Sequence, residues 1–176
     1  MFDDEENFEN TDDRLEKIPL YKKGLEILDL VRQIADLISD DGGNELSSVK
    51  HRLLEDAYML TVKIAAAEAG DLYDIRMENA AIIRKSAMRL MIQNHSLKMF
   101  GFEYVEYFQM VRDLIEEYRL LFIDWVERFD KTNYIIDRWG LFNPPGVDPF
   151  DVDINDIIGD KNNSFFDEFF GEDDEE

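Results

Sequence analysis

The stretch that decides the fold runs from Leu54 to Gln93 and reads LEDAYMLTVKIAAAEAGDLYDIRMENAAIIRKSAMRLMIQ. Apolar residues recur at gaps of three and four on both sides of a turn at Ala69-Gly70-Asp71, and this spacing places side chains on one face of a helix. Before the turn they are Leu46, Val49, Leu53, Ala57, Leu60 and Ile64, and after it Tyr73, Met77, Ala80, Ile83, Ala87, Leu90 and Leu97. The pattern predicts two helices, about 45–69 and 71–99, that run antiparallel because their connection is short.

The turn itself carries two local signals. Gly70 can adopt a left-handed backbone conformation, and Asp71 is a candidate N-cap for the helix that follows. Small side chains end the first helix and permit a neighbouring helix to approach closely. These are Ala65, Ala66, Ala67 and Ala69.

Two further helices are predicted on either side of this pair. Pro19 opens a helix at about 20–39, which the run Asp40-Asp41-Gly42-Gly43-Asn44 ends. Gly101 is expected to cap the third helix, and a fourth follows at about 103–130, or to 139. Its apolar residues keep a heptad spacing, with aromatic side chains that we expect to face the alanines of the second helix. They are Tyr104, Phe108, Val111, Ile115, Tyr118, Phe122, Trp125 and Phe129.

The predicted fold class is all-α, an antiparallel up-down four-helix bundle with acidic, partly disordered tails. The organisation follows from where the composition changes along the chain. We expect an acidic disordered arm at 1–19, the bundle at 20–140, a Pro-containing segment packed on the bundle at 141–150, and an acidic Phe-rich tail at 151–176.

Charge is concentrated at the ends of this chain of 176 residues, whose net charge is -22. Residues 1–19 hold eight acids and two bases, and residues 148–176 hold twelve acids and one base. The chain has no cysteine, which excludes disulfides, thiolate metal sites and thiol catalysis. An acidic start is unlike a targeting signal, and no apolar run approaches the roughly 18 residues of a membrane span. A cytoplasmic location is expected.

Residues from about Ile18 to Phe129 resemble the four-helix-bundle proteins encoded in intervening sequences of large-subunit ribosomal RNA genes. The accessory variability determinant of diversity-generating retroelements is similar. The segments that carry the likeness are Pro19-Leu20-Tyr21-Lys22-Lys23-Gly24-Leu25-Glu26, Ile64-Ala65-Ala66-Ala67-Glu68-Ala69 and Glu78-Asn79-Ala80-Ala81-Ile82-Ile83-Arg84-Lys85.

This resemblance implies an antiparallel four-helix bundle that forms a ring-like homo-oligomer, often a pentamer. Some relatives bind nucleic acid or a reverse transcriptase through basic surfaces. The chain departs from the family in its acidic charge, in its acidic tails and Pro-Pro segment, and in lacking a proline before the alanine-rich helix end.

Catalytic and metal chemistry find little support in the sequence. Di-iron bundles use Glu-x-x-His pairs, and neither His51 nor His95 has a glutamate three residues before it. A cluster of Glu55, Glu68, Glu78 and Glu117 is conceivable, but solvated or arginine-paired side chains are favoured. Glycine-rich phosphate loops and a glycine-flanked serine are also absent. We therefore expect no enzymatic activity, no catalytic residues, no metal and no cofactor.

Basic residues gather on the third predicted helix and are candidates for contact with nucleic acid or an acidic partner. They are Arg76, Arg84, Lys85 and Arg89. The alternative, which we favour, is that they pair with acids on neighbouring helices or with the chain's own tails. Arg84 lies near the seam, where Glu68 or Glu78 would accept its hydrogen bonds.

Two apolar features point to binding. The third helix carries surplus apolar residues, which suit either a central helix with two neighbours or a subunit interface. They are Ala81, Ile82, Met88, Met91 and Ile92. The acidic tail holds a candidate docking motif for a groove on this protein or on a partner, made of Phe165, Phe166, Phe169 and Phe170.

These observations predict a non-enzymatic, self-associating scaffold or adaptor that binds another macromolecule, with no membrane contact. The alternative is a nucleic-acid-associated factor that uses the basic face of the third helix, although the net charge disfavours it. A bundle enzyme is the least supported reading.

Overall fold

The computed structural model describes residues 14–39 and 45–152. Four helices account for most of them: α2 (Pro19–Asp36), α3 (Glu45–Glu68), α4 (Tyr73–Met99) and α5 (Phe108–Glu127). A 3-10 turn, η1 (Val105–Tyr107), precedes α5. The described residues contain no strand, so the predicted all-α class is confirmed.

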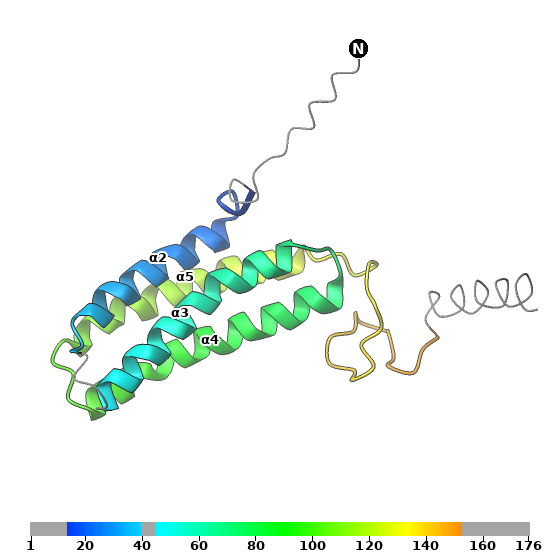
Figure 1. Cartoon of the computed structure of the whole chain (residues 1–176). Helices are drawn as coiled ribbons and strands as arrows, with labels where there is room; N and C mark the ends of the chain where they lie inside the picture. The colour runs from blue at the N-terminus through cyan, green and yellow to red at the C-terminus, as the bar shows by residue number, and fades with distance from the viewer. Residues whose placement is uncertain (1–13, 40–44, 153–176) are drawn as a thin grey trace, which may run out of the picture.

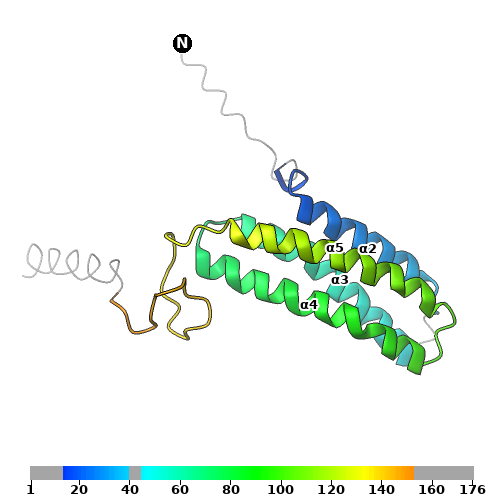
Figure 2. The same cartoon turned by 180° about the vertical axis from the view of Figure 1, so that it is seen from behind.

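The four helices lie side by side, with α2 and α4 each packed against both α3 and α5 (Figures 1 and 2). One end of the assembly holds the connector between α4 and α5, and the other holds the turn between α3 and α4 together with residues 128–152 (Figure 1). Burial of apolar side chains from every helix forms one core, which is the main source of stability. Its fully buried members include Ile27, Val31, Leu53, Leu60, Ile64, Ile83, Leu90, Leu97, Phe108 and Val111.

Helix α2 approaches α3 closely at Gly24. A Cβ atom there would lie 3.0 Å from Thr61 Cγ2 and 3.3 Å from the Leu60 carbonyl oxygen. The buried Tyr118 hydroxyl donates a hydrogen bond of 2.8 Å to that same carbonyl. Glycine therefore permits the close contact between α2 and α3, at the level where α5 is also joined to α3.

The turn between α3 and α4 differs from the prediction. Gly70 does not adopt a positive φ, and Leu72 rather than Asp71 is the N-cap of α4. The Tyr73 N–H donates instead to the Asn133 carbonyl at 2.8 Å, and Asp74 accepts a hydrogen bond from the Ile135 N–H. The chain that follows α5 thus supplies an acceptor for the first N–H of α4 and a donor for the Asp74 carboxylate, in the absence of a side-chain cap.

The C-terminus of α4 is a Schellman motif, as expected for Gly101. This residue has φ +79° and donates to the Lys98 carbonyl, while the Phe102 N–H donates to the Leu97 carbonyl. Both Leu97 and Phe102 are buried, which supplies the apolar contact typical of this motif.

The fourth helix is shorter than predicted at both ends. It begins at Phe108 rather than 103 and ends at Glu127, so its extension to 139 is wrong. Tyr104 precedes the helix, stays 42% exposed and stacks on Tyr107, and it is therefore not part of the seam. Only Ala67 of the four alanines is buried, since Ala66 and Ala69 lie on the surface and Ala65 is half-buried.

Residues 14–18, predicted as part of a disordered arm, contact the bundle. Leu15 is buried, and the Arg14 guanidinium donates to the Glu68 carbonyl at the end of α3. Leu15 is apolar and packs there. The acidic composition of residues 1–19 did not indicate this contact. Residues 1–13 and 153–176 lie outside the described residues.

The chain at the start of the Pro-containing segment closes around the Asp137 carboxylate. Asp137 accepts hydrogen bonds from the backbone N–H groups of Trp139, Leu141 and Phe142. These bonds lower the pKa of Asp137. Leu141 is consequently 75% exposed and Phe150 91% exposed.

Candidate functional site

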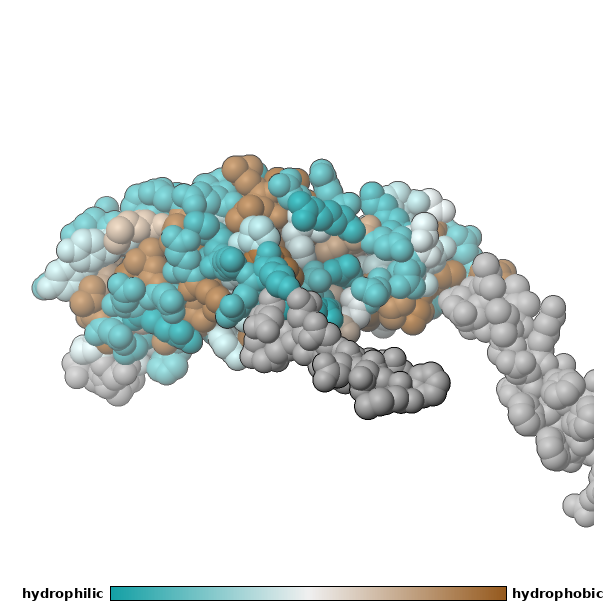
Figure 3. Space-filling model, turned by 90° about the horizontal axis from the view of Figure 1, so that it is seen from above, coloured by the Kyte–Doolittle hydropathy of each residue, from teal (hydrophilic) through white to brown (hydrophobic). Residues whose placement is uncertain are grey.

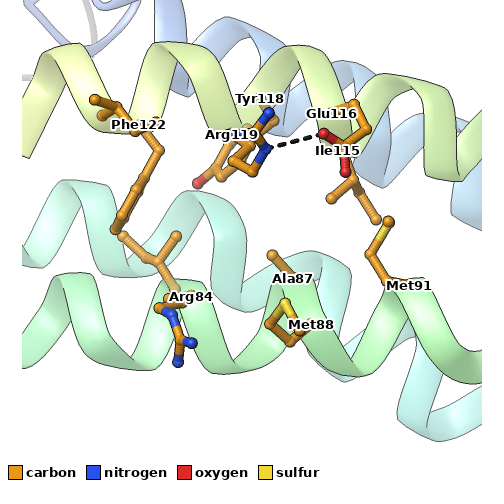
Figure 4. Close-up of a pocket in the computed structure, with 11 residues that line it drawn as sticks. Arg84, Ala87, Met88, Met91, Ile115, Glu116, Tyr118, Arg119 and Phe122 are labelled. Atoms are coloured by element: carbon orange, nitrogen blue, oxygen red, sulfur yellow. Dashed lines mark hydrogen bonds and ion pairs between the residues drawn. The ribbon is translucent and has the colours of Figure 1, made fainter.

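An apolar groove lies between α4 and α5. It encloses about 250 Å³. Phe122 reaches from α5 toward α4, and Met91 reaches from α4 toward Ile115 (Figure 4). We call this the α4–α5 groove, and its lining consists of Ile83, Arg84, Ala87, Met88, Met91, Ile115, Glu116, Tyr118, Arg119, Phe122 and Ile123.

Apolar residues continue from the groove onto the surface beside it. Met88 is 53% exposed on α4, and Ile123 is 42% exposed on α5. Ile92 and Leu120 are also exposed on these helices. In another view of the molecule, apolar residues reach the surface in patches between polar ones (Figure 3). Single exposed apolar side chains are ordinary, but apolar groups gathered around a groove mark a place of contact with another molecule.

The polar groups at the groove are few and cationic on balance. Arg84 is exposed on α4 with its side chain pointing away from α5, and Lys85 beside it is also exposed (Figure 4). Arg119 donates a 2.9 Å hydrogen bond to Glu116 on the same helix. Burial raises the pKa of the Tyr118 hydroxyl, so this group remains protonated and serves as a donor to Leu60. It is therefore a structural group and no acid or base.

The four predicted cationic residues do not form one surface. Arg84 and Lys85 are exposed, whereas Arg76 and Arg89 form ion pairs with acids of α3. The favoured interpretation of internal pairing is thus right for two of the four. The expected bond from Arg84 to Glu68 or Glu78 is not formed: Glu68 accepts from Arg76 and Trp125 instead, and Glu78 is exposed.

Glu68 joins three helices at one end of the bundle. Its Oε1 accepts hydrogen bonds from Arg76 Nη2 at 2.5 Å and from Trp125 Nε1 at 2.8 Å. The Arg76 guanidinium carbon also lies 4.7 Å from the centre of the Phe129 ring, a cation–π contact. This cluster fixes the ends of α3, α4 and α5 relative to one another.

Asp56 and Arg89 form the second ion pair between α3 and α4. Arg89 Nε donates to Asp56 Oδ1 at 2.7 Å, and Nη2 contacts the same oxygen. Burial of the carboxyl raises the pKa of Asp56, although the hydrogen bonds from Arg89 and Ser86 act in the opposite direction.

Sequence reasoning missed a buried polar row on α4. Asn79, Ser86 and Gln93 are all buried, at intervals of seven residues beside the apolar Ile83, Leu90 and Leu97. The Asn79 side chain donates to the Ile75 carbonyl at 2.9 Å, and so it is satisfied within its own helix. The interval of seven residues between these polar side chains could have predicted the row. A pattern made of apolar residues alone does not include them.

The four glutamates considered as a possible cluster do not lie together in the structure. Glu117 bonds Lys23 at 2.8 Å, Glu68 bonds Arg76, and Glu55 and Glu78 are exposed. Across the described part of the chain, no three histidine or carboxylate side chains are grouped so that they could hold a metal ion.

The loop at the end of the bundle offers a smaller concavity of about 270 Å³, where Asp74 and Glu78 of α4 meet Asp137 and Trp139. Trp139 is 89% exposed there. Backbone N–H groups already engage Asp137 and Asp74, so these carboxylates have a structural role.

Comparisons with family models, with curated proteins and with solved structures give no match for this chain. Of the helices in residues 14–39 and 45–152, none has both the length and the apolar character needed to cross a bilayer. The candidate motif of Phe165, Phe166, Phe169 and Phe170 lies outside the described residues.

Proposed function

We infer that this chain is a non-catalytic binding module, built as an antiparallel up-down four-helix bundle, whose α4–α5 groove receives an apolar segment of a protein. The observation that carries this proposal is the groove itself, with exposed Met88 and Ile123 on its two sides. Helical bundles present such grooves to amphipathic segments, whose apolar side chains enter as anchors.

The size and lining of the groove favour a peptide over a small-molecule substrate. Its volume of about 250 Å³ is below the range of about 300–1,000 Å³ typical of ligand sites. Methionine side chains at the opening, Met88 and Met91, are flexible and adapt to apolar partners. The one carboxylate of the lining, Glu116, is paired with Arg119, so we assign the groove no acid–base chemistry.

Self-association is part of the same proposal. Exposed Ile92 and Leu120 extend the apolar surface outside the groove, and such surface suits a contact between copies of the chain. The resemblance to the intervening-sequence family, whose members form homo-oligomers, supports this reading. Light scattering of the purified chain tests it, and a strict monomer at high concentration would contradict it.

The groove proposal is tested with the double variant Met88→Asp and Ile123→Asp. Affinity capture from cells with the wild-type chain should recover a protein partner that the double variant loses. Tyr58→Asp is the matched control, because Tyr58 is 51% exposed on α3 and does not line the groove. Circular dichroism confirms that each variant folds. A partner that binds the groove variant as well as the control would overturn the proposal.

A second candidate function is that of a nucleic-acid-associated factor. The adjacent exposed cations Arg84 and Lys85 favour it, and the family resemblance supports it. Binding of RNA would then weaken with salt, and it would fall in the double variant Arg84→Gln and Lys85→Gln. Because Arg76 and Arg89 are held in ion pairs, their exchange for glutamine would act through stability instead. RNA that fails to bind at low salt would remove this candidate.

A further inference from the structure

We propose that the α4–α5 groove is occupied by the chain's own C-terminal segment, residues 164–176, when no partner is bound. The proposal rests on the function inferred above and names the first occupant of that site. In this proposal, the acidic, Phe-rich segment competes with external partners for the apolar groove.

The chemistry of the segment matches the groove. Phe165 and Phe166 are separated from Phe169 and Phe170 by two acids, so the two pairs recur at an interval of four. An interval of four brings side chains to the same face of a helix, which is the pattern of anchors used by segments that bind grooves. The lining offers apolar contacts from both helices, notably Met88, Met91 and Ile123, against which aromatic rings pack well.

Charge complementarity favours this segment over an arbitrary apolar peptide. Residues 164–176 hold seven acids and no base. Among the charged residues that line the groove, Arg84 and Arg119 outnumber the single acid, Glu116. A bundle that is acidic as a whole therefore presents cations where the most acidic part of the chain would lie, and this attraction should weaken as salt is added.

The chain is long enough to reach. Ile135 bonds Asp74 near the start of α4, and three residues later Arg138 donates to the Asp151 carbonyl at 2.8 Å. The described chain thus leaves the bundle at that end. Met88 lies about 21 Å further along α4 at the helical rise per residue. Fully extended, the chain from Val152 to Phe165 spans about 45 Å. Such a short tether gives the segment an effective concentration on the order of millimolar at the groove.

The absence of cysteine permits a direct test by disulfide trapping in the full-length protein. One variant combines Met88→Cys with Gly171→Cys, and the control combines Tyr58→Cys with Gly171→Cys. The two bundle positions are equally exposed, at 53% and 51%, but only the first lines the groove. Under a mild oxidant, the groove pair should close into an intramolecular disulfide about tenfold faster than the control, because docking raises the local concentration.

Two further variants link the rate to the proposed contacts. In the groove-pair background, Phe165→Ser with Phe169→Ser should reduce the rate to that of the control. Arg84→Gln should slow closure by a smaller factor, and added salt should reduce that difference. Circular dichroism verifies the fold of each variant.

Each result of the trapping experiment either supports or contradicts the docking of residues 164–176 in the groove. Equal rates for the groove and control pairs would overturn the proposal, and so would preferential formation of disulfide-linked dimers, which would place the segment in a second copy. Trapping that fails while Met88→Asp with Ile123→Asp still abolishes partner capture would leave the proposed function intact. Trapping that succeeds while those groove variants retain their partner would refute the proposed function and restrict the groove to the chain's own segment.

Discussion

The two sides of α4 differ in how they are held. Toward α3 and the core, the helix buries Leu90 and a row of polar side chains, and it is fixed by the Arg76–Glu68 and Arg89–Asp56 ion pairs. Toward α5, it leaves a groove bordered by Met88. A helix anchored firmly on one neighbour can leave its other side incompletely filled, and the difference shows that the ion pairs that hold α4 lie on a different face from its groove.

The largest effect expected from this difference is a contrast between Leu90→Ala and Met88→Ala. Leu90 is fully buried, so its truncation leaves a cavity and should lower the free energy of unfolding by about 2–5 kcal/mol. Met88 is 53% exposed on the groove side, and its truncation should change the free energy by less than about 0.5 kcal/mol. Urea unfolding followed by circular dichroism measures both. Similar losses in the two variants would show that the groove side is as tightly packed as the core.

A smaller effect is expected at the anchor that joins α4 to both α3 and α5. Glu68→Gln keeps an oxygen for Trp125 Nε1 but removes the charge that faces Arg76, whose side chain is only 14% exposed. We expect the free energy of unfolding to fall by about 1–3 kcal/mol, since a part-buried cation loses its partner.

Trp125 fluorescence should shift along with this loss, because the indole shares the Glu68 oxygen with Arg76. Glu78→Gln is the control, since Glu78 is an exposed acid of α4, and its exchange should be nearly neutral. If the two variants unfold at the same urea concentration, the Glu68 cluster does not fix the helix ends.

The sequence was sufficient for the core side of this comparison and insufficient for the groove side. Gaps of three and four among apolar residues located the buried positions Val49, Leu60, Ile83 and Leu90, because burial and helical period are coupled. The same gaps carry no information on how far apart α4 and α5 lie. Met88 and Met91 are therefore surplus apolar residues in the sequence pattern, and only the structure shows that both line a groove.

Errors arose where tertiary contacts replaced local signals. The sequence favoured Asp71 as the N-cap of α4. In the structure the Tyr73 N–H donates a hydrogen bond to the Asn133 carbonyl, sixty residues away along the chain. The heptad spacing extended to Tyr104 although the helix starts later, since periodicity does not show where the backbone leaves the helix. Of the candidate cations, Arg76 and Arg89 were drawn into ion pairs whose acids, Glu68 and Asp56, lie on a different helix.

The smallest effect concerns the second anchor and depends on pH. Burial raises the pKa of Asp56 above its ordinary value of 3.8, so the folded chain holds this proton to a higher pH than the unfolded chain does. The contribution of Asp56 to stability is therefore fully present below pH 3.8 and is lost as the pH rises through the raised value. Asp56→Asn cannot titrate and lacks this slope.

The measurement is the free energy of unfolding of wild type minus that of Asp56→Asn, followed by tryptophan fluorescence in dilute protein from about pH 3.5 to 7. This difference should decrease with rising pH in the window just above pH 3.8. Glu45→Gln removes an exposed acid at the start of α3 that does not act on Asp56, and it should leave this pH dependence unchanged. A difference that instead grows with pH would mean that the attraction of Arg89 exceeds the cost of burying the carboxylate. The Asp56–Arg89 pair would then stabilise the α3 side of α4 most strongly in its charged form, and the contrast with the groove side would be greater at neutral pH.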